Sequence, residues 1–259
     1  MDKGERGIYD KRNRLNELTG KEWLPSTKSV WISKKSVIDK DAFEHPAPFL
    51  LEDVKRLVKF FTKSGDTVAD IFMGSGTSII AACQEDRFGL GIDLNKTYCS
   101  LARRRLKKLN IPKTKFQIIQ GDSLEKLKKI KSIDYCVTSP PYHNILKNKG
   151  DGVRHDGSQK RQGVEFYSEN ENDVGNQKTY QGFLKSVEKI MALVYKKLKD
   201  KKFHLIFMQV YNDINVINGI KKFKDPVNFL YSLLKQLKNK NIVIKLHPKE
   251  FNGSDIFGV

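Results

Sequence analysis

An acid, two glycines and two hydroxyl side chains stand together in one short stretch, Asp70-Ile-Phe-Met-Gly-Ser-Gly-Thr77, between a predicted strand and a predicted helix. Glycines let a ligand approach the backbone closely, and the start of the helix offers free N–H groups. The acid would repel a pyrophosphate, so the loop favours a cationic ligand with an amino group, such as S-adenosylmethionine. An ordinary strand–helix turn, whose glycines serve packing alone, is the alternative at this point.

Two more acids stand at the ends of the next two predicted strands. Asp93 ends the second strand, where a carboxylate can accept hydrogen bonds from two ribose hydroxyls. Asp122 ends the third, where it can accept from an adenine amino group or serve as the N-cap of the next helix. A nicotinamide dinucleotide fits less well, because its fingerprint needs glycine or alanine at the position of Ile79.

The element Ser139-Pro140-Pro141-Tyr142 directly follows a fourth apolar strand. Its two prolines fix φ and remove two N–H donors, which leaves rigid carbonyls without neighbouring donors. The Ser139 hydroxyl and the Pro140 carbonyl can each accept one N–H bond of an exocyclic amino group, which directs the nitrogen lone pair towards an incoming methyl group. Tyr142 offers a planar face for stacking a flipped base. A proline-rich strand end with a packing tyrosine is the alternative.

Strands and helices alternate around these motifs. The pattern predicts helices at 50–61, 78–85, 96–109, 123–129, 183–198 and 227–237, and strands at 67–72, 88–94, 116–120, 133–138, 203–211, 242–246 and 256–259. This alternation predicts an α/β fold, a doubly wound and mostly parallel Rossmann-like sheet with helices on both faces. Such sheets bind ligands at the carboxyl ends of their strands, and each motif falls at such an end.

Composition narrows the class of protein. The 259 residues carry a formal net charge of +18, and no apolar run approaches the roughly 18 residues of a membrane helix. Three scattered cysteines form neither a disulfide framework nor a metal site, which favours a reducing, cytoplasmic location. The charge excess indicates a polyanion partner such as nucleic acid. Part of the positive charge lies at the end of the predicted helix 96–109, away from the expected base site. The residues that carry it are Arg103, Arg104, Arg105, Lys107 and Lys108.

Taken in order, the motifs resemble those of the DNA amino-methyltransferases that act on cytosine N4 or adenine N6, over most of the chain. The loop at 70–77 resembles the family's cofactor motif, with Ile71 in place of its proline. Thr138-Ser-Pro-Pro-Tyr142 resembles the catalytic motif, and His45-Pro-Ala-Pro-Phe49 resembles the segment that precedes the loop. The resemblance implies S-adenosylmethionine as the cofactor and calls for no metal.

The resemblance also implies roles for individual residues. The implied catalytic residues are Ser139, Pro140, Pro141 and Tyr142. The implied cofactor-binding residues are Pro46, Asp70, Phe72, Gly74, Ser75, Gly76, Thr77, Asp93, Asp122 and Ser123. No covalent adduct with the base is needed, so Cys136, inside the fourth strand, is expected to be a buried structural thiol.

Serine at the first position of the catalytic motif is associated in this family mainly with cytosine. The expected function is therefore methyl transfer to cytosine N4 in double-stranded DNA by base flipping, within a restriction–modification system. The alternatives are transfer to adenine N6, an RNA or protein-glutamine amino-methyltransferase, and a non-catalytic DNA-binding subunit.

The expected organisation is an N-terminal arm, 1–44, with DNA or cofactor-site contacts, followed by a catalytic domain, 45–259. A polar insertion at 143–180 is the candidate target-recognition loop. Its candidate DNA contacts are Lys147, Lys149, Arg154, Lys160 and Arg161. No sizeable domain follows the last predicted strand, so target reading is expected to fall to residues 143–180, to the N-terminal 44 residues or to a partner chain. A cognate restriction endonuclease or a separate specificity chain is a candidate partner, and no membrane is expected.

Overall fold

The computed structural model describes residues 10, 12–28, 32–141, 168, 170–210 and 242–248, of which 201, 205–210 and 242–248 are described by their backbone alone. The predicted helix at 227–237 and the predicted strand at 256–259 lie outside these residues. No helix among the described residues is long and apolar enough to cross a membrane.

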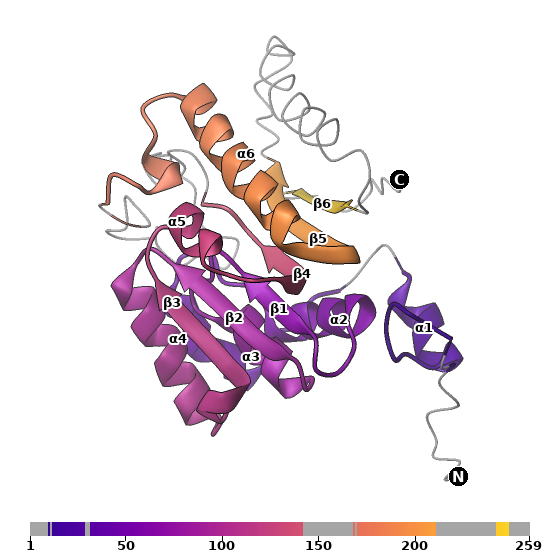
Figure 1. Cartoon of the computed structure of the whole chain (residues 1–259). Coiled ribbons are helices and arrows are strands. Elements are labelled where there is room, and N and C mark those ends of the chain that lie inside the picture. Colours follow the sequence, from indigo (N-terminus) through magenta and orange to yellow (C-terminus); the bar gives the residue numbers. More distant parts are fainter. Residues whose placement is uncertain are drawn as a thin grey trace.

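The six described strands form one sheet in the order β3-β2-β1-β4-β5-β6, with every neighbouring pair parallel (Figure 1). The strands are β1 (Thr67–Asp70), β2 (Phe88–Asp93), β3 (Phe116–Gln120), β4 (Ile133–Thr138), β5 (Leu198–Val210) and β6 (Ile242–Pro248). The predicted parallel α/β fold is confirmed. The strand order changes direction between β1 and β4, which is where such sheets open a crevice for a ligand.

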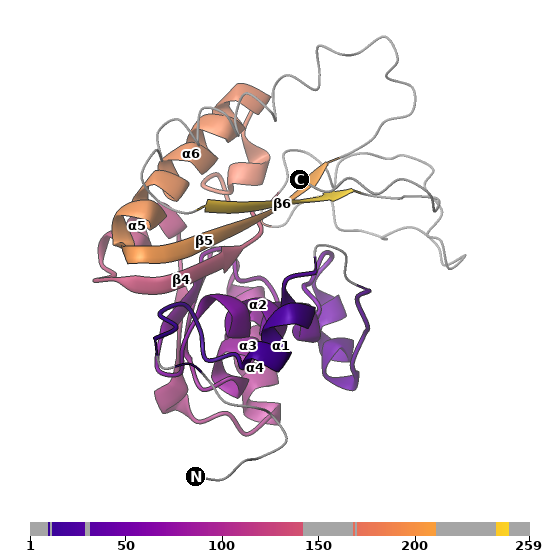
Figure 2. The ribbon, with the colours of Figure 1, turned by 90° about the vertical axis from the view of Figure 1, so that its right-hand side faces the viewer.

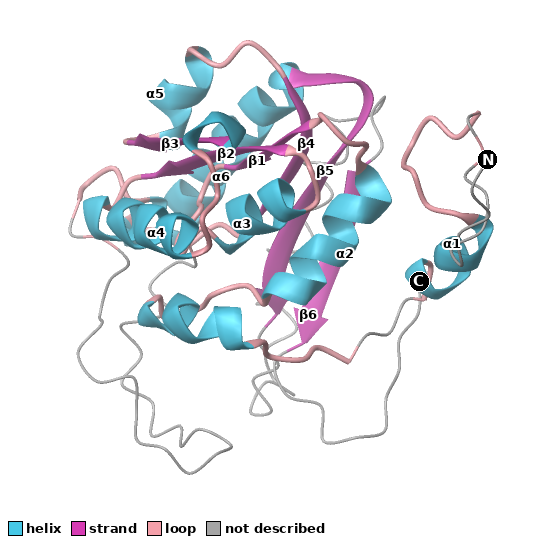
Figure 3. Ribbon diagram, turned by 90° about the horizontal axis from the view of Figure 1, so that it is seen from below, coloured by secondary structure: helices cyan, strands magenta, loops and turns pink. Residues whose placement is uncertain are grey.

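Helices cover both faces of this sheet (Figures 2 and 3). One face carries α2 (Leu51–Phe61), α3 (Thr77–Gln84) and α4 (Lys96–Lys108), whose apolar residues pack with Val68 and Tyr135. The other carries α5 (Ser123–Lys128) and α6 (Tyr180–Lys197), which pack with Ala69 and Cys136. Successive strand residues point to opposite faces, so neighbours such as Val68 and Ala69 join different cores.

The fifth strand begins earlier than the sequence pattern predicts. The pattern predicts a helix that ends at Leu198 and a strand that begins at Phe203, but β5 starts at Leu198, opposite Ile133 of β4, and includes the lysine-rich residues 199–202. The register shifts between Ile133 and Tyr135, where the strand pairing is irregular. Two of the lysines explain the extension, because they form ion pairs with acids at the amino ends of β1 and β4.

Shorter elements make up the N-terminal arm and the connections. They are α1 (Gly20–Ser26) and the 3-10 helices η1 (Val37–Glu44), η2 (Lys113–Lys115) and η4 (Val174–Asn176). The arm first packs at the amino ends of the strands, where the Asn16 amide donates to the Phe60 carbonyl at 2.7 Å. It then reaches α4, where Asp41 of η1 pairs with Lys108 at 2.7 Å.

Candidate functional site

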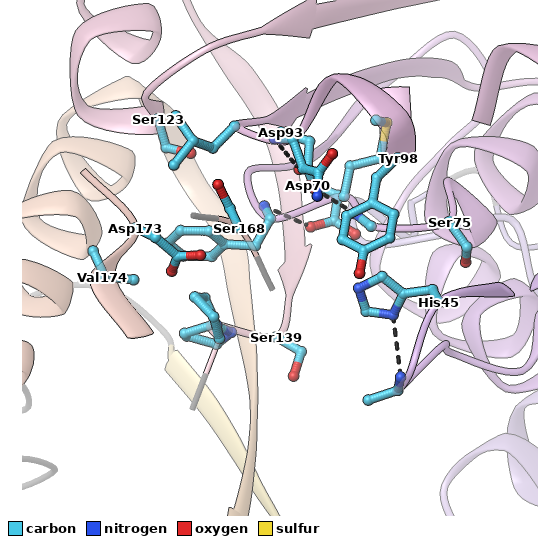
Figure 4. A pocket seen from close by; sticks show the side chains of 18 of the residues that line it. His45, Asp70, Ser75, Asp93, Tyr98, Ser123, Ser139, Ser168, Asp173 and Val174 are labelled. Carbon is cyan, nitrogen blue, oxygen red and sulfur yellow. Dashed lines mark hydrogen bonds between the residues drawn. The ribbon is translucent and has the colours of Figure 1, made fainter. Parts of the chain in front are cut away.

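One pocket lies at the carboxyl ends of β1 to β4, and most of the predicted site residues line it (Figure 4). The predicted residues in its wall are Asp70, Phe72, Gly74, Ser75, Thr77, Asp93, Asp122, Ser123, Ser139, Pro140 and Pro141. The predicted cofactor loop and the start of the predicted catalytic motif therefore share one cavity, at the point where the strand order reverses. Pro46 and Gly76 are not part of the wall.

Both loop glycines adopt left-handed backbone conformations, with φ of 53° at Gly74 and 78° at Gly76. A Cβ on Gly76 would lie 2.5 Å from the Cβ of Ala102, so this glycine permits close packing of α3 on α4 rather than contact with the pocket. A Cβ on Gly74 would lie 2.9 Å from Nε2 of His45. The loop thus combines the two interpretations of its glycines: Gly76 serves packing and Gly74 keeps the pocket wall close to the backbone.

Asp70 is a buried acid that joins the cofactor loop to the fourth strand. Its Oδ1 accepts hydrogen bonds from the Thr138 hydroxyl at 2.7 Å and the Phe72 N–H at 3.1 Å. Its Oδ2 accepts from the Ser78 hydroxyl at 2.5 Å. Burial raises the pKa of Asp70 to about 6, against the opposing effect of these donors.

Asp93 is the second buried acid of the pocket. Its two oxygens accept from the N–H groups of Gly74, at 2.7 Å, and Asn95, at 2.8 Å. Burial raises the pKa of Asp93 to about 6, the two N–H donors oppose the rise, and the charges of Asp70 and Asp173 add to it. Because like charges and desolvation both disfavour the ionised form, a bound cation would stabilise this group.

Asp122 and Ser123 lie at the start of α5 and also face the pocket. The Asp122 carboxylate accepts from the Leu124 N–H at 2.7 Å and so forms the predicted N-cap of the helix. The Ser123 hydroxyl donates to the Ile71 carbonyl at 2.5 Å, which ties the start of α5 to the cofactor loop. The capping and pocket-lining roles of Asp122 are therefore compatible.

A second group of pocket residues was missed by the sequence reasoning. Ser168, Asn172, Asp173 and Val174, which precede α6, form the wall opposite the cofactor loop. Asp173 is 5% exposed, caps η4 by accepting from the Gly175 N–H at 2.8 Å, and has its pKa raised by burial. No local pattern marks Asp173, because its place in the pocket wall depends on how the end of the polar segment packs on the rest of the fold.

An aromatic pair completes the wall on the side of α4. The rings of His45 and Tyr98 lie 4.5 Å apart in an edge-to-face arrangement. Burial raises the pKa of Tyr98 to about 12, and the charges of Asp93 and Asp173 add to this effect. His45 belongs to the segment that resembles the family pattern, so a signal for it was present, whereas Tyr98 lacked one.

Arg105 shows that the cationic cluster at the end of α4 is largely structural. Its side chain is 2% exposed, and its guanidinium donates to the Ser75 carbonyl at 2.7 Å and to the Thr77 hydroxyl at 2.9 Å. Two other cations of the cluster, Arg104 and Lys108, pair with acids of η1. This part of the net charge holds the cofactor loop and the arm in place.

The remaining predictions concern cysteine, metal and DNA. Cys136 is fully buried and burial raises the pKa of its thiol well above the usual value, which confirms the expected structural thiol. Among the described residues, no group of His, Cys, Asp and Glu side chains is arranged to hold a metal ion. Tyr142 and the predicted DNA contacts lie outside the described residues: Lys147, Lys149, Arg154, Lys160 and Arg161.

The N-terminal part of the chain, which includes the cofactor loop, is similar in sequence to known proteins. Residues 3–104 match the sequence model of a family described as DNA methylase. The chain is 40% identical over 108 residues to the orphan methyltransferase M.BamHII of Bacillus amyloliquefaciens, covering 40% of this chain and 38% of that protein. It is 37% identical over 101 residues to the type II methyltransferase M.BglI of Bacillus subtilis, covering 39% of this chain and 28% of that protein.

These matches span about a third of the length of the curated relatives. Among solved structures, precorrin 8W decarboxylase of Methanobacterium thermoautotrophicum has a TM-score of 0.46 at 16% identity, over 75% of each chain. A protein of Thermus thermophilus, described as a DNA modification methylase and solved with S-adenosyl-L-methionine, has a TM-score of 0.32 at 30% identity, over 40% of this chain and 39% of that one.

Proposed function

We propose that this chain, whose residues 3–104 match the sequence model of the DNA methylase family, is a DNA amino-methyltransferase that transfers a methyl group from S-adenosylmethionine to an exocyclic amino group in DNA. One observation carries the proposal: Asp70 of the cofactor loop and Ser139 of the Ser-Pro-Pro element line a single pocket at the carboxyl ends of β1 and β4. An acid for a cationic cofactor and a pair of acceptors for an amino group are thereby brought within one cavity.

The side chains of the pocket fit the cofactor by charge. S-adenosylmethionine is a cation at its sulfur and at its amino group, and the pocket presents Asp70, Asp93 and Asp173, whose pKa values are all raised by burial. A cation would lower the cost of ionising these buried groups. We assign Asp70 to the cofactor's amino group, Asp93 to its ribose hydroxyls and Asp122 to its adenine amino group.

The reacting amino group is assigned to the start of the predicted catalytic motif. Its two N–H bonds would be accepted by the Ser139 hydroxyl oxygen and the Pro140 carbonyl, which leaves the nitrogen lone pair facing the cofactor. When bound, S-adenosylmethionine supplies an electrophilic methyl group. The nitrogen–carbon bond would form as the carbon–sulfur bond breaks, the electron pair would stay on sulfur as a neutral thioether, and the amine would lose one proton to water.

We assign cytosine N4 as the acceptor, because serine occupies the first position of the motif. A cytosine in double-stranded DNA must leave the base stack to reach Pro140 and Ser139, so the reaction requires base flipping. Adenine N6 is the second candidate, since an adenine amino group offers the same two N–H donors. The proposed partner is a cognate restriction endonuclease or a specificity chain; the type II methyltransferases among the relatives favour it, and the orphan methyltransferase does not.

The test is incubation of the purified chain with S-adenosylmethionine labelled on its methyl group, together with double-stranded DNA, RNA or protein in separate reactions. Label is expected in DNA alone. Label in RNA or protein but not in DNA would replace the proposed substrate by one of the alternatives. Label in none of them, from a chain that binds the cofactor, would contradict methyl transfer as its function.

A further inference from the structure

The place of Ser139 relative to the cofactor loop depends on how β1 and β4 are held together at their carboxyl ends. The backbone register between these strands ends with Ala69 opposite Cys136. Beyond that pair, a side-chain hydrogen bond spans the opening crevice: the Thr138 hydroxyl donates to Oδ1 of Asp70 at 2.7 Å. The motif that is assigned to the target base is therefore tied to the motif that is assigned to the cofactor.

This hydrogen bond is well placed to act as a restraint. Thr138 is 0% exposed and Asp70 is 1% exposed, so water does not compete for either partner. A hydrogen bond to a carboxylate is shorter and stronger than one between neutral groups. Thr138 immediately precedes Ser139, so the bond fixes the backbone from which the Ser139 hydroxyl projects.

The other oxygen of the Asp70 carboxylate has a donor in the helix that follows the cofactor loop. Its Oδ2 accepts from the hydroxyl of Ser78 in α3, the helix whose N-terminus follows the glycine loop. Ser78 is also fully buried. Asp70 therefore has one hydroxyl donor from the helix that supports the cofactor loop and one from the strand that supports Ser139.

We propose that Thr138 is a positioning residue for methyl transfer: its bond to Asp70 sets the place of Ser139 relative to the cofactor, whereas Ser78 sets the place of Asp70 for cofactor binding. This inference rests on the proposed function. Thr138 does not line the pocket and touches no reacting atom, so it acts only through its neighbour in the chain.

Four variants separate the role of the Thr138 hydroxyl from that of the Ser78 hydroxyl. Thr138→Val removes the hydroxyl and keeps the shape of the side chain, and Thr138→Ser keeps the hydroxyl. Ser78→Ala removes the other hydroxyl donor from the same carboxylate. Thr114→Val, at an exposed position in η2, is the matched control for loss of a threonine hydroxyl. For each, S-adenosylmethionine affinity is measured by calorimetry and the transfer rate to DNA by single-turnover assay at saturation.

Thr138→Val is expected to lower the single-turnover rate about 10- to 100-fold, the effect of one lost hydrogen bond to a charged group, with cofactor Kd changed less than about 3-fold. Thr138→Ser is expected to restore the rate to within about 3-fold of the wild type. Ser78→Ala is expected to show the opposite split, with a Kd weakened about 10-fold and a rate at saturation much closer to normal. Thr114→Val should match the wild type in both.

Three results would overturn the proposal. A wild-type transfer rate in Thr138→Val is the first, and equal losses in Thr138→Val and Thr138→Ser are the second. The third is loss of cofactor affinity in Thr138→Val by as much as the rate, because Thr138 would then serve folding or cofactor binding alone. A wild-type chain that binds the cofactor but labels no DNA would instead refute the proposed function, so the two failures are distinguishable.

Discussion

Asp70 and Asp134 are two buried acids at opposite ends of the strands of one sheet, and they differ in the charge of their partners. Asp134, near the start of β4, lies 2.9 Å from Nζ of Lys199 and 3.5 Å from Nζ of Lys202. Burial acts to raise the pKa of Asp134, but Lys199, the Thr67 N–H and Lys202 together lower it. Asp70 has neutral donors instead, and burial raises its pKa to about 6.

The contrast extends to the neighbours of each acid. At the amino ends of the strands, Asp66 also pairs with Lys202, at 2.7 Å. At the carboxyl ends, no ion pair within the described part of the chain reaches Asp70, Asp93 or Asp173. The charge of an acid that pairs with lysine is already neutralised, so such an acid is structural. Hydroxyl and N–H donors do not neutralise a carboxylate, so an acid held by them can still pair with a cationic ligand.

The largest expected effect comes from the pocket end, at Ser139. Ser139→Ala removes one of the two proposed acceptors for the amino group, and we expect the transfer rate to fall by about 100-fold or more. Cofactor affinity is expected to stay within about 3-fold of the wild type, because Ser139 is assigned to the base and not to the cofactor. Single-turnover assays and calorimetry measure the two quantities, and an unchanged rate would remove Ser139 from the mechanism.

Exchanging each buried acid for its amide tests the comparison directly. Asp70→Asn is expected to weaken S-adenosylmethionine binding about 10- to 100-fold, because the charge opposite the cofactor's cation is lost. Asp134→Asn is expected to leave that affinity unchanged and to reduce the free energy of unfolding by about 1–3 kcal/mol, since Lys199 loses its buried partner. Calorimetry measures the affinity and denaturant unfolding the stability, and weaker cofactor binding in both variants would contradict a cofactor role specific to Asp70.

The same comparison predicts a pH dependence for cofactor binding. The pKa values of Asp70 and Asp93 are both raised to about 6, so these acids protonate as the pH falls through 6 and the pocket loses its negative charge. Affinity for S-adenosylmethionine is expected to drop about tenfold between pH 7 and pH 5. 5′-Methylthioadenosine, which keeps the ribose and adenine but lacks the amino group assigned to Asp70, is the control and should lose less. Equal losses for S-adenosylmethionine and this ligand would contradict the assignment of Asp70 to the amino group.

The contributions of Asp70 and Asp134 to the free energy of unfolding of the ligand-free protein change with pH in opposite directions. Asp70 has a folded pKa above its usual 3.8, so its contribution to stability is present below that value and is lost as the pH rises through about 6. Asp134 has a lowered pKa, so its contribution is present above 3.8 and is lost as the pH falls. Unfolding curves from pH 2 to pH 8 measure both effects. The stability difference between Asp70→Asn and the wild type should change as the pH passes about 6, and the difference between Asp134→Asn and the wild type should shrink as the pH falls below 3.8.

The smallest expected effect lies on the surface, between η1 and α4. Glu44 pairs with Arg104, and both side chains are more than half exposed. Glu44→Gln is expected to change the free energy of unfolding by less than about 0.5 kcal/mol, because exposed ion pairs contribute little. Denaturant unfolding measures it. A large loss of stability would mean that the arm depends on this contact more than on its buried ones.

Sequence reasoning reached the fold and the pocket because both follow from local patterns. Apolar strands alternating with helices dictate a parallel sheet, and Asp70, Asp93, Asp122 and Ser139 stand at strand ends, which meet at one edge. The start of α1 also follows from a local pattern, because Thr19 and Glu22, three residues apart, form a capping box there.

What the sequence could not supply depends on contacts between distant segments. Arg105 stands in a run of cations, and only the packing of α4 shows that it is the buried one. The start of β5 is rich in lysine, so its sequence does not predict a strand. In the fold, Lys199 pairs with Asp134 and Lys202 with Asp66, and these ion pairs hold the segment beside β4. Asp173 lies in the pocket wall because its neighbour Val174 packs in the core between α6 and the sheet.

Mass spectrometry of nucleosides from double-stranded DNA treated with the purified chain and S-adenosylmethionine identifies the methylated base directly. N4-methylcytosine is expected from the wild type and none from Ser139→Ala. N6-methyladenine in its place would keep the pocket chemistry and change the base. The absence of any methylated base, with a wild-type chain that binds the cofactor, would contradict methyl transfer to DNA.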